Sequence, residues 1–186
     1  MGYVRGFIPW IAFAAVSTVG WQWGALAGLA AGVYLIRKNR RAGVAADALI
    51  LDISTVFYFA AITALAFAAP DSPLRPYSGA ISFLWLAVTA FGGLATGRPF
   101  TVGIARQTTP QEYWHTPAFL RINKVITTAW GTAFLLTGIA VAVCDAANAG
   151  SLASTVLEVI GFVAPAVFTA RYPKAVQKRY AAMAQA

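Results

Sequence analysis

The sequence predicts an all-α protein, a bundle of about five transmembrane helices that forms a single domain over residues 1–186. Three observations support this fold class: the composition, the spacing of the apolar stretches and the placement of the basic residues. Hydrophobic residues make up 59% of the chain and charged residues only 11%, whereas a soluble domain carries roughly 25% charged residues. A soluble core of this size has no room for so much apolar surface, but a bilayer accommodates it.

Five apolar stretches follow one another along the chain. They cover residues 7–36, 48–69, 77–96, 125–143 and 152–170. Each approaches the roughly 20 residues that cross a hydrocarbon core, and backbone groups in lipid must bond within their own segment, so we expect helices. Proline at residues 70 and 73 ends the second stretch, and Asn148 and Gly150 mark the turn before the fifth. Thr116 followed by Pro117 is typical of an N-cap, so we expect the fourth helix to begin at Pro117.

The first stretch permits three interpretations, because about 30 apolar residues exceed one untilted span. It is one long tilted helix, or a short re-entrant helix over residues 8–19 followed by a second helix, or a signal peptide cleaved near residues 25–27. The apolar run continues to Ile36, which argues against cleavage. Gly20 and Gly24 flank a polar interruption, so we favour a break near Gly20.

The basic residues predict the orientation. Twelve of the 14 Lys and Arg follow the first, third and fifth stretches: Arg37, Lys38, Arg40 and Arg41; Arg98, Arg106, Arg121 and Lys124; Arg171, Lys174, Lys178 and Arg179. Only Arg5 and Arg75 lie elsewhere. Basic residues near span ends concentrate in the cytoplasm, so we expect a multi-pass protein of the bacterial inner membrane with a cytoplasmic C-terminus. This placement explains the net charge of +8 without nucleic acid as a partner.

A stripe of small residues predicts a packing face. Gly20, Gly24, Gly28 and Gly32 recur every four residues, which places them along one side of a helix. Small residues allow a neighbouring helix to approach closely. The neighbour is either another helix of this chain or a second copy, so a homo-oligomer is one of the two expectations.

Two carboxylates lie inside the apolar stretches and are candidate functional residues, since such groups are costly in lipid unless paired. Asp52 lies about 7 Å inside the second stretch and Glu158 about 9 Å inside the fifth, at about 1.5 Å per residue. Lys124 and Arg121 enter the fourth helix from the same side as Asp52. We therefore hypothesise that Asp52 pairs with Lys124, or failing that with Arg121. The alternative is that Asp52 reaches water at the interface.

The sequence contains no sign of an enzyme, a cofactor or a metal centre. It has one cysteine, Cys144, and one histidine, His115, whereas a metal site needs three or four ligands. Residues 97–124 form the most distinctive segment, in which arginines alternate with aromatic residues. We expect an interfacial loop there. The alternative is a binding site for a lipid headgroup or a partner protein.

The same segment carries a resemblance to a known family. Arg98-Pro99-Phe100 is followed by Trp114, Pro117, Arg121, Asn123 and Trp130. Near the N-terminus, Phe7-Ile8-Pro9 precedes a long apolar helix and a basic run. Over most of its length the chain resembles the intracellular septation protein A family of bacterial inner-membrane proteins, although residues 106–109 depart from the family's pattern. The resemblance implies a role in cell division or envelope maintenance, with membrane lipids and envelope or division proteins as partners. The alternative is a small transporter or channel subunit with Asp52 or Glu158 in a polar cavity.

Overall fold

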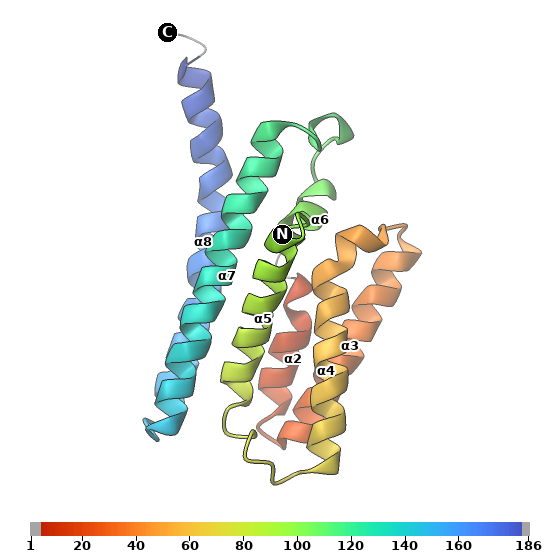
Figure 1. Cartoon of the computed structure of the whole chain (residues 1–186). Helices are drawn as coiled ribbons and strands as arrows, with labels where there is room; N and C mark the ends of the chain where they lie inside the picture. The colour runs from red at the N-terminus through yellow and green to blue at the C-terminus, as the bar shows by residue number, and fades with distance from the viewer. Residues whose placement is uncertain (1–4, 184–186) are drawn as a thin grey trace. The chain divides into compact units, whose positions relative to one another are not determined.

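The computed structural model describes residues 5–183, and these residues form helices and no strand (Figure 1). The elements in chain order are α2 (Ile8–Val16), α3 (Trp21–Arg41), the short 3-10 helix η1 (Ala46–Leu49), α4 (Ile50–Ala68), α5 (Ser78–Ala95), α6 (Phe100–Arg106), the 3-10 helix η2 (Gln111–Tyr113), α7 (Pro117–Ala146) and α8 (Ser151–Met183). The all-α prediction is confirmed.

Within residues 5–183, four helices are long and apolar enough to cross a membrane: Ile50–Ala68, Arg75–Ala95, Pro117–Ala146 and Ser151–Lys178. They correspond to the second to fifth apolar stretches. The shortest has 19 residues and therefore spans about 28 Å, close to the roughly 30 Å of a hydrocarbon core. The protein is accordingly a helical membrane protein.

The first stretch is broken, as favoured from the sequence. Gly20 is the N-cap of α3, and the chain turns between α2 and α3 so that the two helices pack side by side and antiparallel, with Phe13 beside Gly24 and Pro9 beside Gly32. A single long helix over this stretch is therefore wrong. With nine residues, α2 is about 13 Å long and cannot cross a bilayer alone.

The glycines of α3 lie against two neighbouring helices. A Cβ added at Gly24 would overlap Ser17 of the segment after α2, and one added at Gly28 would lie 2.7 Å from the Phe59 ring of α4. At Gly32 the neighbour is Val56 of α4, 2.9 Å away. Gly20 differs, because it caps the helix and its Cβ would meet only the nearby side chains of Gln22 and Trp23.

Helix α3 runs antiparallel beside most of α4. At one end the Trp21 indole Nε1 donates a hydrogen bond to the carbonyl oxygen of Pro70, at 2.9 Å, and toward the other end Gly32 contacts Val56. Helix α3 is not among the four helices that are long and apolar enough to cross, and its last turn carries Lys38, Arg40 and Arg41. The fifth span predicted from the sequence therefore stays a prediction.

The described contacts divide the chain into two compact units. Unit 1 contains the chain up to Ser78 together with residues 102–108, and unit 2 contains residues 79–101 and the chain from Thr109 onward. The core of unit 1 is an aromatic cluster whose ring centroids lie 4.8–5.5 Å apart: Trp10, Phe13, Tyr58 and Phe59. The single domain predicted for residues 1–186 stays a prediction.

Unit 2 joins α5, α7 and α8 around a second aromatic cluster. Phe83 of α5, Phe134 of α7 and Phe162 of α8 have ring centroids 5.0–6.0 Å apart. Glycines again mark the closest approaches. A Cβ at Gly138 of α7 would lie 2.9 Å from Leu84 of α5, and one at Gly161 of α8 would overlap Thr137 of α7.

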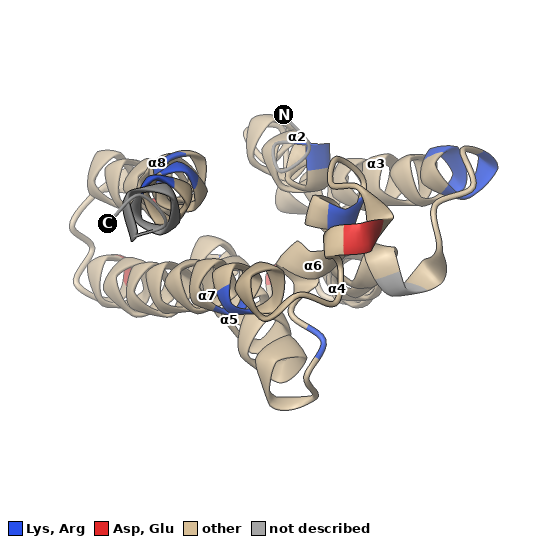
Figure 2. Ribbon diagram, turned by 90° about the horizontal axis from the view of Figure 1, so that it is seen from above, with Lys and Arg blue, Asp and Glu red and all other residues tan. Residues whose placement is uncertain are grey.

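The antiparallel packing of α2 and α3 also determines where Arg5 lies, a residue that the sequence analysis placed outside the three basic clusters. Gly6 contacts Leu51 in the first turn of α4, so Arg5 lies toward the end of unit 1 where α3 finishes in Arg37–Arg41. Figure 2 shows the basic residues of α3 gathered at that end. Gly103 of α6 packs on the backbone of Ala48 in η1, which brings the α6 segment and its Arg106 to the same end.

We predict that Gly28→Leu lowers the stability of the protein in detergent. The added side chain must displace the Phe59 ring, and overpacking of this kind costs about 1–3 kcal/mol. The matched control is Gly92→Leu in α5, where an added Cβ meets no atom within 4 Å. Thermal unfolding should show a lower melting temperature for Gly28→Leu only. An unchanged melting curve for this variant would mean that the α3 stripe does not carry the packing of unit 1.

Candidate functional site

The segment predicted as an interfacial loop is largely ordered secondary structure. It contains α6, η2 and the first two turns of α7. Gly97, with φ of +71°, ends α5: its N–H donates to Leu94 and the Arg98 N–H donates to Gly93, a pairing that needs a left-handed residue and therefore favours glycine. The prediction of a loop is wrong for residues 100–106, which form α6 and bury Phe100 and Thr101. The interfacial position of the segment stays a prediction.

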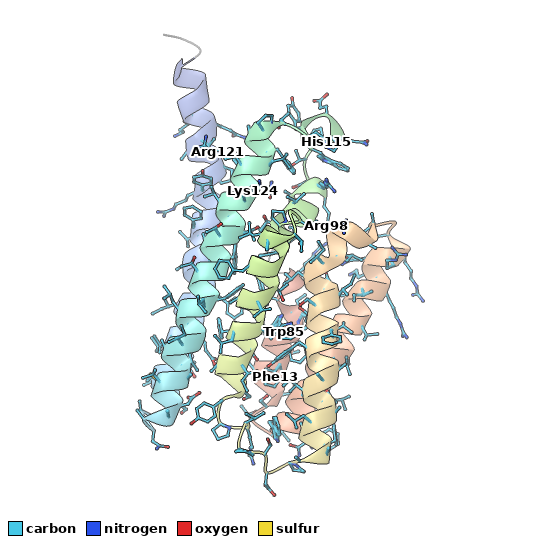
Figure 3. The ribbon with its side chains drawn as sticks, viewed as in Figure 1. Phe13, Trp85, Arg98, His115, Arg121 and Lys124 are labelled. Carbon is cyan, nitrogen blue, oxygen red and sulfur yellow. The ribbon has the colours of Figure 1, made fainter. Side chains whose placement is uncertain are left out.

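Helix α7 begins at Pro117, as predicted from the sequence. Thr116 is its N-cap, and the backbone N–H of Phe119 donates to Thr116 Oγ1 at 3.3 Å. Pro117 occupies the first turn, where its missing N–H costs nothing. The helix therefore begins two turns before its apolar stretch, and it carries Arg121 and Lys124 on exposed positions at that end (Figure 3).

A buried polar cluster fastens α6 to α7. The hydroxyl of Thr101 donates to the backbone oxygen of Asn123 at 2.9 Å and lies 2.7 Å from the hydroxyl of Thr127. The Asn123 amide Nδ2 donates to the Phe119 carbonyl at 2.9 Å. All three polar side chains are at most 2% exposed. Because a buried polar group without a partner is costly, these bonds hold the start of α6 against α7.

A second buried bond joins α7 to α8. The indole Nε1 of Trp130 donates to Thr169 Oγ1 at 2.9 Å, and that hydroxyl donates to the carbonyl of Pro165 at 2.8 Å. Trp130 is 2% exposed. Phe100, Asn123 and Trp130 of the sequence motif are therefore helix-packing residues, and Thr101, Thr127 and Thr169 are partners that the sequence did not single out.

The remaining residues of the motif differ in exposure. Arg98 and Arg121 are exposed, whereas Pro99 is buried. Trp114 is half-buried, and its Nε1 donates to the carbonyl of Thr109 at 2.8 Å. This bond closes a loop over residues 109–116, which we call the docking loop. Its exposed side chains include Glu112, Tyr113 and His115.

The two intramembrane carboxylates lie in different units. Asp52 occupies the first turn of α4 in unit 1, where it is half-buried, and Lys124 is exposed on α7 in unit 2. Their pairing stays a prediction. Glu158 of α8 lies against Gly79 of α5, within electrostatic range of Asp145 at the end of α7. Ser154 donates a hydrogen bond to Asp145 Oδ1 at 2.8 Å.

The described residues contain no metal-binding cluster, since no group of three or more of their His, Cys, Asp and Glu side chains is placed to hold a metal ion. Cys144 is a free, half-buried thiol on α7. The described side chains thus offer hydrogen bonds between helices, the separate carboxylates Asp145 and Glu158 in unit 2, and exposed basic and aromatic groups around the start of α7.

We predict that Thr101→Val destabilises the protein by about 1–3 kcal/mol, the cost of breaking buried hydrogen bonds without changing side-chain shape much. The control is Thr128→Val on α7, because the exposed Thr128 hydroxyl donates to the Lys124 carbonyl within its own helix. Chemical or thermal unfolding in detergent measures both. Equal stability of the two variants would show that the Thr101 cluster does not hold α6 to α7.

No protein-family model matches the chain, and neither a curated protein nor a solved structure matches it.

Proposed function

We propose that the protein is a bacterial inner-membrane protein that acts in cell division or envelope maintenance by binding other envelope proteins, with its basic ends and C-terminus in the cytoplasm. The apolar helices support the membrane location. The gathering of basic residues at one end of α3 in unit 1, and around the start of α7 and the end of α8 in unit 2, supports the orientation. The resemblance to the septation protein A family supports the role.

The docking loop is the observation that carries this proposal. Besides the Trp114–Thr109 bond, the Thr116 hydroxyl donates to the Tyr113 carbonyl at 2.8 Å, and backbone bonds link Tyr113 to Pro110 and Trp114 to Gln111. The loop thus holds its own shape while Tyr113, 51% exposed, and His115 point outward. A preordered loop loses little conformational entropy on binding, and exposed aromatic side chains are common anchors of protein interfaces.

The buried polar groups agree with a binding role. In unit 2 the hydroxyls of Thr101 and Thr169 and the indole of Trp130 are engaged in bonds between helices. They stabilise a scaffold that presents the loop, in the manner of many proteins whose binding residues sit on loops above rigid elements. This arrangement favours recognition over chemistry.

A second candidate function is that of a small transporter or channel subunit. The observation that favours it is Glu158, a half-buried carboxylate inside an apolar helix and against Gly79 of α5. Ionisable groups at such positions commonly serve ion or proton pathways. The experiment below separates the two functions.

The test is complementation in cells of the source organism that lack the protein. Cell length and survival in low-osmolarity medium are measured after restoring the wild type, the loop variant Tyr113→Ala/His115→Ala, or Glu158→Gln. We expect the wild type and Glu158→Gln to restore both properties, and the loop variant to fail although it reaches the membrane at normal levels. The matched control is Leu74→Ala/Arg75→Ala, which changes two exposed residues of the connection between α4 and α5.

Two results would contradict the proposal. Full complementation by the loop variant would remove the docking loop from the function. Failure of Glu158→Gln, together with an ion flux in proteoliposomes that this substitution abolishes, would establish the transporter function instead.

A further inference from the structure

One face of α8 is apolar, exposed and turned away from α7. Residues Val156, Ile160, Val163 and Val167 are 43–55% exposed and are spaced by four, three and four positions. At about 100° per residue they lie within roughly 60° of one another. Gly161, Pro165 and Thr169, which are buried, lie on the opposite side, where Gly161 meets Thr137 and Thr169 meets Trp130 of α7.

Basic residues continue this face without a change of direction. Arg171, Lys174 and Lys178 follow Val167 at spacings of four, three and four, and all three are exposed. Helix α8 remains helical through this segment (Figure 1), and its basic side is visible from above in Figure 2. We call the whole surface the α8 lipid face.

The part of this face next to the cations is long enough for an acyl chain of one leaflet. From Val156 to Val167 the apolar part extends about 16 Å, at about 1.5 Å per residue, which is close to half of the roughly 30 Å hydrocarbon core. The three cations begin one turn beyond Val167, at the depth of the headgroups. Phe168 and Tyr172, stacked with centroids 5.0 Å apart, flank this boundary, where aromatic residues favour the interface.

The cations on this face have no acidic neighbour along the helix. The last acidic side chain of the sequence is Glu158, which lies 20 residues before Lys178 and therefore about 30 Å from it along the helix, at about 1.5 Å per residue. Three exposed cations in one row therefore offer a site for anions. Phosphate groups are well suited because Arg and Lys bind them through charge-assisted hydrogen bonds.

We propose that the α8 lipid face binds an anionic diacyl phospholipid of the cytoplasmic leaflet. An acyl chain lies along Val156, Ile160, Val163 and Val167, and the headgroup phosphate contacts Arg171, Lys174 and Lys178. This inference rests on the proposed orientation of the protein but is independent of the docking loop and its partner.

A second copy of the chain is the other occupant with a matching apolar surface. Two parallel copies meeting across this face would bring three cations against three cations, and such like-charge contacts are unfavourable. An anionic lipid satisfies the same apolar residues and neutralises the charges. Charge complementarity therefore selects the lipid.

The test uses the purified full chain in detergent and native mass spectrometry with added phosphatidylglycerol or phosphatidylcholine. We expect the wild type to retain phosphatidylglycerol in preference to phosphatidylcholine. In the variant Arg171→Gln/Lys174→Gln/Lys178→Gln this preference should fall by about fivefold for each removed cation. The matched control is Arg37→Gln/Lys38→Gln/Arg40→Gln, which removes the same charge from the end of α3. An equal loss in the control would show unspecific attraction and overturn the proposal.

A second measurement does not depend on the stability of the triple variant. A photoreactive amino acid replaces Val167, or as a control Leu136, an exposed residue of α7, and the protein is irradiated in vesicles of mixed phosphatidylglycerol and phosphatidylcholine. Position 167 should capture phosphatidylglycerol in excess of its share, whereas position 136 should not. Capture of a second copy at position 167, or of both lipids in proportion to their abundance, would overturn the proposal.

Discussion

The fold depends on close helix contacts at glycine. Lipid is as apolar as the helices, so burial of apolar surface does not drive them together, and association depends on dense packing and on hydrogen bonds between helices. Such contacts occur in both units: Gly28 and Gly32 lie against Phe59 and Val56 in unit 1, and Gly138 and Gly161 lie against Leu84 and Thr137 in unit 2. The bond between Trp130 and Thr169 forms because α7 and α8 approach so closely.

The sequence predicted the features that a local pattern records. Apolar length located α4, α5, α7 and α8, and the glycine spacing of four pointed to the packing side of α3. The glycines of unit 2 lie singly on different helices and leave no such pattern. The same limit hid Thr101 and Thr169. A threonine in a helix commonly bonds to a carbonyl of its own helix, as Thr128 does, and only the rotation of each helix decides which hydroxyl also reaches a neighbour. The seven residues of α6 are too few to show a period.

The break at Gly20 connects the packing to the orientation. It returns α2 along α3, so Arg5 lies toward the end of unit 1 that carries the basic residues of α3. The proposed cytoplasmic side then carries the docking loop and the basic part of the α8 lipid face, both of which belong to unit 2. A protein that recognises an envelope partner through the loop and a phospholipid through α8 would act where the membrane surface meets the cytoplasm.

The orientation of the membrane bundle is the central claim, and a topology reporter tests it most directly. An enzyme that is active only in the periplasm is fused after Ala186, and in a second strain it is inserted between Asp71 and Ser72, in the connection between α4 and α5. The account predicts no activity from the first fusion and activity from the second, with both proteins present in the membrane. Activity after Ala186 would contradict the orientation, and with it the placement of the docking loop and the α8 lipid face.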